Sequence, residues 1–334
     1  MPSVAVFGAA GFTGALTARL LFRHPSFELR SVTARSDVGR RLDGLYPHHR
    51  VPLTLEELDL DRHADVDAAV VAYPHGAAAP VVAALRERGV RLVDLSADFR
   101  LRDAMVYGAW YREHEAPELL EEAVYGLPEL YREEIRGADI VANPGCYPTA
   151  TLLGLAPLAR AGLIADVVVD AKSGVSGAGR AATEKTHFVT VDENVAAYGV
   201  PRHRHTPEIE QELAELGADV RITFTAHLLP LDQGELVSCY VTPTEAGRGV
   251  GLAELEALYA EEFGSEPFVE LAGGPPGVRD VRETNICRIS VHHDERTGRV
   301  IVFSVIDNLW KGSASQAVQN LNLMFDLDEG EGIS

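Results

Sequence analysis

Residues 3–14 are Ser-Val-Ala-Val-Phe-Gly-Ala-Ala-Gly-Phe-Thr-Gly, an apolar run that passes into a turn rich in glycine. Residues 13–23 continue with a helical pattern, so the chain is expected to open as strand, glycine turn and helix. A second strand is expected over residues 27–33. Later apolar runs alternate with helix-like stretches, the runs at 68–73, 90–95 and 138–142 and the stretches near 76–88 and 129–136. This alternation is typical of a parallel sheet wound through crossover helices.

The glycine turn is expected to bind a dinucleotide. Small residues let the backbone approach a pyrophosphate, and the start of the following helix offers unpaired N–H donors and a positive dipole end. Taken alone, the turn could also be an ordinary tight connection between a strand and a helix. The residues expected to contact the cofactor here are Gly8, Ala10, Gly11, Phe12, Thr13 and Gly14.

The end of the second strand indicates which dinucleotide is bound. An acidic residue in this region would bond the ribose 2′-hydroxyl of NAD, but the strand ends in Thr33-Ala34-Arg35-Ser36. The guanidinium of Arg35 and the hydroxyl of Ser36 suit a 2′-phosphate. NADP is therefore the favoured cofactor. NAD stays an alternative, because the acidic Asp37 is close to these residues in the sequence.

The pattern changes after about residue 165. Longer, β-branched, alternating runs occur there, with a helix near 251–263, and predict a mixed or antiparallel sheet. A final helical pattern from Lys311 to about Leu327 is expected to return to the first domain. The expected organisation is α/β, with a Rossmann-type domain over 1–145 that the helix 311–334 rejoins, and a second domain over 146–310.

Composition excludes several classes of protein. Acidic side chains exceed basic ones by 20, 50 against 30, and no cluster of Lys or Arg interrupts that balance. Nucleic acid and anionic membranes are therefore not expected partners. No apolar run is long enough to span a bilayer, and the three scattered cysteines form neither a disulfide framework nor a metal-ligand pair. A reduced, cytoplasmic setting without a protein-bound metal is expected.

One of these cysteines lies in an unusual sequence. Val141-Ala-Asn-Pro-Gly-Cys146-Tyr-Pro-Thr runs from the end of a strand into an apolar helical stretch. The thiolate is the reactive form of cysteine, and N–H groups at a helix start lower the pKa of a thiol. Pro and Gly before Cys146 give a sharp turn that a core residue would not need, whereas Cys239 and Cys287 lie within strand patterns and are expected in the core.

The segment from Val141 to Pro157 resembles the active-site signature of the N-acetyl-γ-glutamyl-phosphate reductases, relatives of the aspartate-semialdehyde dehydrogenases. The similarity extends over the chain in family order, through Gly8 to Gly14, Ser96-Ala-Asp-Phe-Arg100, Ser173-Gly-Val-Ser-Gly-Ala-Gly179, His203-Arg-His205-Thr-Pro-Glu and Asp307-Asn-Leu-Trp-Lys-Gly312. The resemblance implies a fold like that of glyceraldehyde-3-phosphate dehydrogenase, with a catalytic and oligomerising second domain and a homodimer or homotetramer.

A cysteine that forms a thioester needs a partner for its proton, and histidine suits that role at neutral pH. The resemblance implies that one histidine of residues 203–205 is this acid and base, with His205 preferred to His203. An anionic substrate needs local cations in so acidic a chain, and the candidates are Arg100, Arg202, Arg204 and Lys185. Surface ion pairs are an equal alternative for each of them. The resemblance implies that Asn308 contacts the nicotinamide end of the cofactor. Ser173, Gly174 and Gly177 are expected to bring backbone N–H groups to the cofactor, and a flexible loop is the alternative for their glycine-rich segment.

The resemblance implies NADPH-dependent reduction of N-acetyl-γ-glutamyl phosphate to its semialdehyde through a thioester on Cys146, in arginine biosynthesis. Two alternatives stay open: a reductase for aminoadipyl or glutamyl phosphate on a small acidic carrier protein, in lysine or ornithine biosynthesis, and a non-catalytic NADP-sensing protein. The acidic surface disfavours the carrier. A short-chain dehydrogenase is also disfavoured, because no Tyr stands four residues before a Lys.

Overall fold

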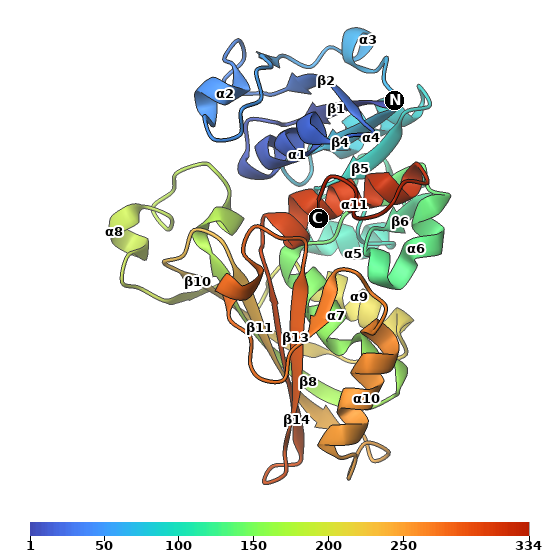
Figure 1. Cartoon of the computed structure of the whole chain (residues 1–334), viewed down its shortest axis with the longest axis vertical. Coiled ribbons are helices and arrows are strands. Elements are labelled where there is room, and N and C mark those ends of the chain that lie inside the picture. The colour runs from blue at the N-terminus through green and yellow to red at the C-terminus, as the bar shows by residue number, and fades with distance from the viewer. Residues whose placement is uncertain (334) are drawn as a thin grey trace. The chain divides into compact units, whose positions relative to one another are not determined.

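The computed structural model describes residues 1–333, which form two compact units (Figure 1). The first unit is Met1–Gly145 with Ser313–Ser334, and the second unit is Cys146–Gly312. Each unit is built around its own seven-stranded sheet.

The sheet of the first unit is parallel throughout. Its strand order is β3-β2-β1-β4-β5-β7-β6. The strands are β1 (Ser3–Phe7), β2 (Glu28–Thr33), β3 (Leu55–Glu56), β4 (Ala68–Val71), β5 (Arg91–Asp94), β6 (Ala123–Tyr125) and β7 (Ile140–Ala142). The order reverses between β1 and β4, and the crevice at the carboxyl end of such a switch point is where doubly wound sheets bind ligands. Gly8 follows β1 at this place.

Helices cover both faces of this sheet. Ala5 and Phe7 of β1 share a core with Val82 and Leu85 of α4. On the opposite face α1 packs against α11, and α11 also packs against α6. The helical elements of the first unit are α1 (Phe12–Arg23), α2 (Leu42–Leu45), α3 (Leu60–His63), α4 (Ala79–Arg86), α5 (Ala104–Trp110), η1 (Pro117–Leu119), α6 (Pro128–Arg136) and α11 (Ser315–Met324).

The sheet of the second unit is mixed, in the order β12-β13-β14-β11-β8-β10-β9. Two strand pairs, β8 with β10 and β12 with β13, are parallel, and the others are antiparallel. The strands are β8 (Ile164–Gly174), β9 (Ala196–Tyr198), β10 (Ile222–Leu229), β11 (Glu235–Pro243), β12 (Val269–Leu271), β13 (Cys287–Asp294) and β14 (Arg299–Ile306).

Three helices of the second unit, α7 (Cys146–Arg160), α9 (Thr206–Glu215) and α10 (Leu252–Phe263), pack against this sheet. Residues 147–159 of α7 are all buried, so α7 is the central helix of the unit. Shorter elements complete it: η2 (Val175–Ala178), α8 (Phe188–Val191), η3 (Val278–Val281) and the π-helical turn η4 (Trp310–Ala314), which continues into α11.

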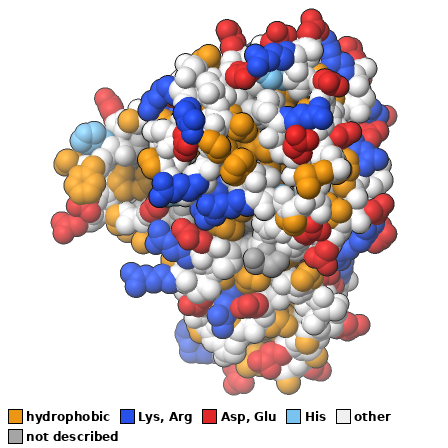
Figure 2. All heavy atoms as spheres, turned by 45° about the horizontal axis from the view of Figure 1, so that its top comes forward, with side chains coloured by type: hydrophobic (Ala, Val, Ile, Leu, Met, Phe, Trp, Pro, Cys, Tyr) orange, Lys and Arg blue, Asp and Glu red, His pale blue; other side chains and the backbone are white. Residues whose placement is uncertain are grey.

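The α/β class and the mixed second sheet are confirmed. The expected strands and helices occur within a few residues of their predicted ends. The short strands β3, β6, β9 and β12 were not predicted, because two or three residues carry no measurable alternation. Acidic side chains lie among basic ones on the face that Figure 2 shows. Within residues 1–333, no helix combines the length and the apolar character that crossing a bilayer requires.

Candidate active site

In the turn after β1, Gly8 and Gly14 leave no room for a side chain, whereas Gly11 borders free space. Gly8 has φ +94°, and a Cβ there would lie 2.4 Å from the carbonyl oxygen of Ala72. A Cβ on Gly14 would lie 2.5 Å from the carbonyl oxygen of Gly8, so both positions need glycine. A Cβ on Gly11 would meet nothing nearer than 3.7 Å, and no side chain caps the start of α1. Backbone N–H groups at an open, uncapped helix start fit a pyrophosphate.

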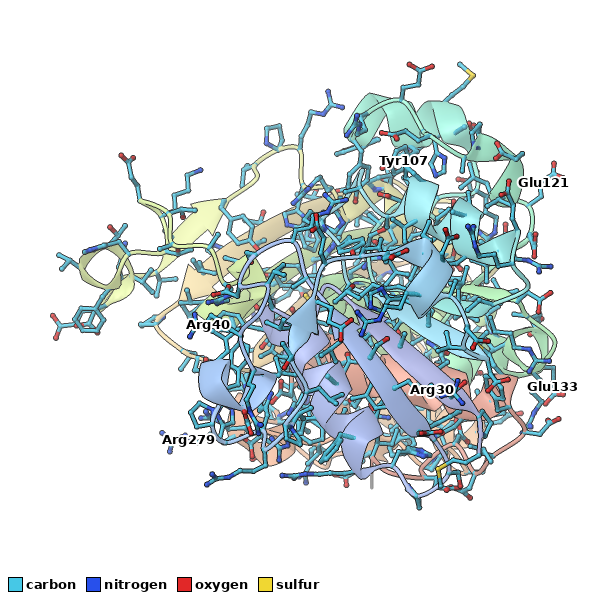
Figure 3. The ribbon with its side chains drawn as sticks, turned by 90° about the horizontal axis from the view of Figure 1, so that it is seen from above. Arg30, Arg40, Tyr107, Glu121, Glu133 and Arg279 are labelled. Carbon is cyan, nitrogen blue, oxygen red and sulfur yellow. The ribbon has the colours of Figure 1, made fainter. Side chains whose placement is uncertain are left out.

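The end of β2 lies directly beside this turn. The backbone N–H groups of Gly8 and Ala9 both donate to the carbonyl oxygen of Thr33, at 2.9 Å. The exposed guanidinium of Arg35 lies 4.6 Å from the centre of the Tyr73 ring. Arg40, labelled in Figure 3, binds the carboxylate of Asp37 at 2.7 Å.

This ion pair bears on the choice of dinucleotide. Asp37 was the residue that kept NAD as an alternative cofactor, and Arg40 balances its negative charge. The segment after β2 therefore offers a cationic rather than an anionic surface, as a 2′-phosphate requires.

The Ser96–Arg100 block forms a buried network in the first unit. The Asp98 carboxylate accepts hydrogen bonds from the N–H groups of Gly76, Ala78 and Ala79, where α4 begins, and from the Tyr107 hydroxyl. Burial, aided by the charge of Asp98, raises the pKa of Asp94 to about 7. The block thus fixes the loop between β4 and α4.

Arg100 belongs to the same network and is 5% exposed. Its Nε donates to the carbonyl oxygen of Asn143 at 2.8 Å, and its Nη2 donates to that of Leu95 at 2.9 Å. The amide of Asn320 in α11 holds the Asn143 side chain at 3.1 Å. Arg100 therefore braces the loop that leads to Cys146, and its contact with substrate stays a prediction.

Cys146 is the first residue of α7 and follows the last residue of β7, Ala142, by four positions, where the sequence placed the change from strand to helix. It is partly exposed, whereas Asn143–Gly145 and Tyr147 are buried. A Cβ on Gly312 would lie 2.8 Å from the Cβ of Cys146, so Gly312 makes room for the cysteine. The N–H groups of a helix start favour the thiolate form of a cysteine in this position.

The other two cysteines lie in the core, as predicted. Cys239 and Cys287 are both fully buried. Burial raises the pKa of Cys239 to about 12, and the sulfur of Cys287 lies 3.2 Å from the Ser304 hydroxyl. Neither has the exposure that a nucleophile needs.

Both candidate histidines lie in an aromatic cluster that includes Tyr147. The ring centres of His203 and His205 lie 5.6 and 5.8 Å from that of Tyr147. The cluster also includes Phe224 and Tyr198, whose hydroxyl donates to the Tyr147 hydroxyl at 3.0 Å. The segment 203–205 is therefore held beside the residue that follows Cys146.

The two histidines differ in their surroundings. Burial, and next the charge of Arg204, lower the pKa of His203 to about 4. Its Nδ1 accepts the backbone N–H of His205 at 3.2 Å, which fixes it as a neutral ring. His205 immediately precedes α9 and, like His203, is partly exposed. These observations favour His205 as the group that exchanges protons.

The residues predicted around 173–177 and 308 are brought together. The side-chain oxygen of Asn308 accepts the N–H of Gly234 at 2.8 Å, and its amide donates to the Ser176 hydroxyl at 3.0 Å. A Cβ on Gly177 would lie 3.2 Å from the Ser173 hydroxyl and 3.6 Å from the Asn308 amide nitrogen. Gly174 is also required, because a Cβ there would lie 2.6 Å from the carbonyl oxygen of Asp232.

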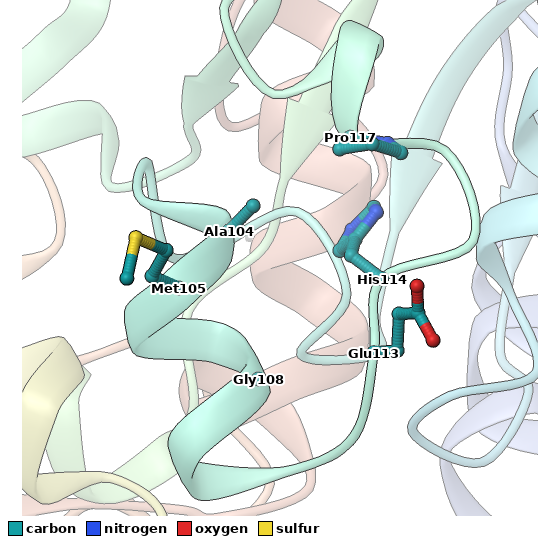
Figure 4. Close-up of a pocket in the computed structure, with 6 residues that line it drawn as sticks. All are labelled: Ala104, Met105, Gly108, Glu113, His114 and Pro117. Carbon is teal, nitrogen blue, oxygen red and sulfur yellow. The ribbon is translucent and has the colours of Figure 1, made fainter.

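The remaining predicted residues lie on the surface of the second unit. Arg202, Arg204 and Lys185 are exposed. In the first unit a shallow pocket of about 440 Å³ is lined by Ala104, Met105, Gly108, Glu113, His114 and Pro117, which Figure 4 labels. It contains no predicted site residue. Among residues 1–333, no three His, Cys, Asp or Glu side chains are grouped as a metal site would need.

Sequence reasoning missed Glu235, the first residue of β11. Its side chain is fully buried, and the Cys146 thiol is its hydrogen-bonding neighbour. The available signal was a carboxylate at the start of the apolar alternating run 235–242, where a buried strand normally carries none.

Comparison with known proteins agrees with this organisation. Residues 3–138 match the family model described as semialdehyde dehydrogenase, NAD binding domain, and residues 146–308 match semialdehyde dehydrogenase, dimerisation domain. Two solved aspartate-semialdehyde dehydrogenases share the fold. One is from Vibrio cholerae (TM-score 0.72, 20% identity, covering 98% of both chains) and one, with NADP, from Candida albicans (TM-score 0.70, 14% identity, covering 97% of this chain and 98% of the other).

Closer relatives carry a more specific name. Proteins named N-acetyl-gamma-glutamyl-phosphate reductase are 52% identical in Desulforudis audaxviator (100% of this chain, 98% of the relative) and 49% identical in Halorhodospira halophila (100% and 98%). A third, from Moorella thermoacetica, is 48% identical (98% and 97%). The chain belongs to the N-acetyl-γ-glutamyl-phosphate reductase family of the semialdehyde dehydrogenases.

Proposed function

We propose that this protein reduces N-acetyl-γ-glutamyl phosphate with NADPH to N-acetylglutamate 5-semialdehyde and phosphate, a step of arginine biosynthesis. Full-length similarity to reductases of that name supports this function. The observation that carries it is the partly exposed Cys146 at the start of α7, with the His203–His205 segment packed on Tyr147.

The first half of the reaction is an acyl transfer to sulfur. The thiolate of Cys146 attacks the acyl carbon, the carbon–oxygen bond to phosphate breaks, and phosphate leaves with the electron pair. Phosphate is a good leaving group and needs little acid assistance. Backbone N–H groups in the first turn of α7 stabilise the negative charge on the carbonyl oxygen. Arg202, Arg204, Lys185 and Arg100 are the proposed contacts of the substrate anions.

The second half is a reduction of the thioester. When bound at the glycine turn, NADPH supplies the hydride for the thioester carbonyl. His205 donates a proton to the resulting oxygen anion and accepts it again as the carbon–sulfur bond breaks, which releases the aldehyde and restores the thiolate. Ser173, Gly174, Gly177 and Asn308 are proposed to hold the nicotinamide end.

The reverse reaction tests this function directly. NADP⁺ reduction should depend on both N-acetylglutamate semialdehyde and phosphate, with at least roughly a hundredfold preference in kcat/KM over aspartate semialdehyde. Equal rates with the two aldehydes, or no need for phosphate, would contradict the proposed substrate.

A carrier-bound acyl phosphate is the second candidate substrate. A small acidic carrier prefers a basic docking face, and this chain has 20 excess negative charges, which disfavours such a partner. Activity on the free N-acetyl compound without any carrier would exclude a carrier requirement.

Arg35 provides a prediction about cofactor choice. Arg35→Ala should raise KM for NADPH by roughly tenfold to a hundredfold and leave KM for NADH within about twofold, because only the 2′-phosphate loses a cation. Steady-state kinetics with both cofactors measure this. Arg30→Ala is the control, since this exposed arginine of β2 binds Glu28 and Asp65 instead. Equal losses with NADH and NADPH would show that Arg35 does not read the 2′-phosphate.

We also propose that the protein is a homodimer or homotetramer in the cytoplasm. The match of residues 146–308 to a dimerisation domain supports self-association. Cys146, Cys239 and Cys287 are free thiols, as a reducing compartment requires.

A further inference from the structure

Glu235 is a carboxyl group buried without a compensating cation. It is the first residue of β11, where it pairs with Ser173 of β8 and Ile306 of β14, and its exposed fraction is 0%. Apart from its contact with the Cys146 thiol, neither carboxyl oxygen has a hydrogen-bond partner among residues 1–333. A carboxylate in that position would pay the full desolvation penalty, so the neutral acid is favoured.

The side chain is oriented toward the nucleophile. Burial raises the pKa of Glu235 to about 8, a hydrogen bond with the Cys146 thiol lowers it, and the charge of Asp307 raises it. Ile306, the β14 partner of Glu235, lies against Gly312, and Gly312 lies against the Cβ of Cys146. The pairing of β11 with β14 and the packing of Gly312 therefore both indicate that Glu235 lies near Cys146.

The side chains that interact with Glu235 besides Cys146 are phenols and another carboxyl group. Tyr147 and Tyr198 both interact with Glu235 and Cys146, and burial raises the pKa of both phenols, so they stay neutral. The Asp307 carboxylate is engaged by the N–H groups of Glu283, Leu309 and Trp310. Besides burial, the groups that shift the pKa of Glu235 are the Cys146 thiol and the Asp307 carboxylate, and neither is a cation.

We propose that Glu235 is a further catalytic residue, whose neutral carboxyl group donates a hydrogen bond to the Cys146 sulfur when the sulfur is negatively charged. This inference rests on the proposed role of Cys146. The sulfur is an anion before it attacks the acyl phosphate and again as it leaves the aldehyde. The carboxyl proton is shared with sulfur and not consumed, while His205 carries the proton of the oxygen anion.

The proposal makes the two groups one titrating pair. Removing the first proton gives a mixture of two states, one with a thiolate and a carboxylic acid and the other with a thiol and a carboxylate. Removing the second proton requires a higher pH, because two neighbouring anions repel each other. The thiolate fraction of the wild-type protein should therefore rise in two steps as pH increases. Glutamine cannot ionise but keeps an N–H donor, so Glu235→Gln should show a single step.

Alkylation by iodoacetamide measures this without substrate or cofactor. The rate of modification of the Cys146 peptide, followed by mass spectrometry from about pH 6 to about pH 10, is expected to show two steps in the wild type and one in Glu235→Gln. Glu235→Leu removes the donor and should slow alkylation at neutral pH by about tenfold, the effect of one pKa unit. The control Glu245→Gln, an exposed residue of the same unit, should follow the wild type.

Superimposable single-step curves for the wild type and Glu235→Gln would overturn the proposal. Two steps that persist in Glu235→Gln would assign the second group to another residue and overturn it as well. Because no substrate is present, this result is independent of the reductase assay, and a protein that fails on N-acetylglutamate semialdehyde still reports on the pair.

Unfolding supplies a second readout. A carboxyl whose pKa rises from 4.5 to about 8 on folding binds more protons in the folded state between these values. The folded protein therefore loses stability as pH rises through that window. The melting temperature of Glu235→Gln should be higher than that of the wild type at about pH 8, and the two should be equal near pH 4. An equal difference at both pH values would show that the carboxyl is not held neutral.

Discussion

Replacing Cys146 by Ser is expected to lower kcat for N-acetyl-γ-glutamyl phosphate reduction by at least roughly a thousandfold, because a hydroxyl ionises far less readily than a thiol and makes a poorer leaving group. NADPH affinity should change by less than about twofold, since the substitution exchanges a single atom and removes no group that is proposed to hold the cofactor. Stopped-flow kinetics and fluorescence titration of NADPH measure the two quantities.

The matched control is Cys239→Ala. Cys239 is fully buried in β11, and burial raises the pKa of its thiol to about 12. The folded fraction of this variant should keep the specific activity of the wild type while its melting temperature falls. Turnover retained by Cys146→Ser, or lost by Cys239→Ala in folded protein, would remove Cys146 from the mechanism.

The second large effect concerns His205. His205→Asn should lower kcat by about a hundredfold to ten-thousandfold, the usual contribution of a general acid and base. KM for the acyl phosphate should change little, because the imidazole acts in the transition state. The loss should be accompanied by a change in the pH dependence of kcat, because the group that donates and accepts the proton is gone.

His203 gives the comparison within the same loop. Its pKa is lowered to about 4, so it is neutral throughout the pH range of an assay near neutrality. His203→Asn should therefore preserve the shape of the kcat profile and act through stability, since its ring packs against Phe224, Tyr147 and Tyr198. If His203→Asn changed the pH dependence of kcat and His205→Asn did not, the two assignments would have to be exchanged.

The parts of the site that depend on local sequence could be predicted. Gly8, Gly11 and Gly14 identify the turn because strand, turn and helix follow one another along the chain. Cys146 was placed at a helix start because Pro and Gly precede it. Both inferences use information from fewer than about twenty neighbouring residues, which a single sequence provides.

The parts that depend on contacts between distant residues could not be predicted. Glu235 becomes a neighbour of Cys146 only because β11 lies between β8 and β14 in a specific register. The two bonds of Arg100 to backbone carbonyls likewise depend on how the loops after β5 and β7 meet. The sequence showed only that Arg100 is a cation in the Ser96–Arg100 block. The structure shows that it donates hydrogen bonds to the carbonyl oxygens of Asn143 and Leu95.

The difference between His203 and His205 is of the same kind. Both histidines lie in one polar loop segment, and only the family resemblance favoured His205 over His203 as the acid and base. The fold distinguishes them, because Phe224 of β10 and Tyr198 of β9 pack against the ring of His203, and burial lowers the pKa of that ring to about 4.

The central claim is that Cys146 carries the acyl group, and trapping that intermediate tests it most directly. The protein is mixed with N-acetyl-γ-glutamyl phosphate in the absence of NADPH, quenched in acid, digested and analysed by mass spectrometry. The account predicts the mass of an N-acetylglutamyl group on the peptide that contains Cys146, and its loss when NADPH is added before the quench. An acyl group on any other residue, or an unmodified Cys146 in protein that turns over when NADPH is supplied, would contradict the account.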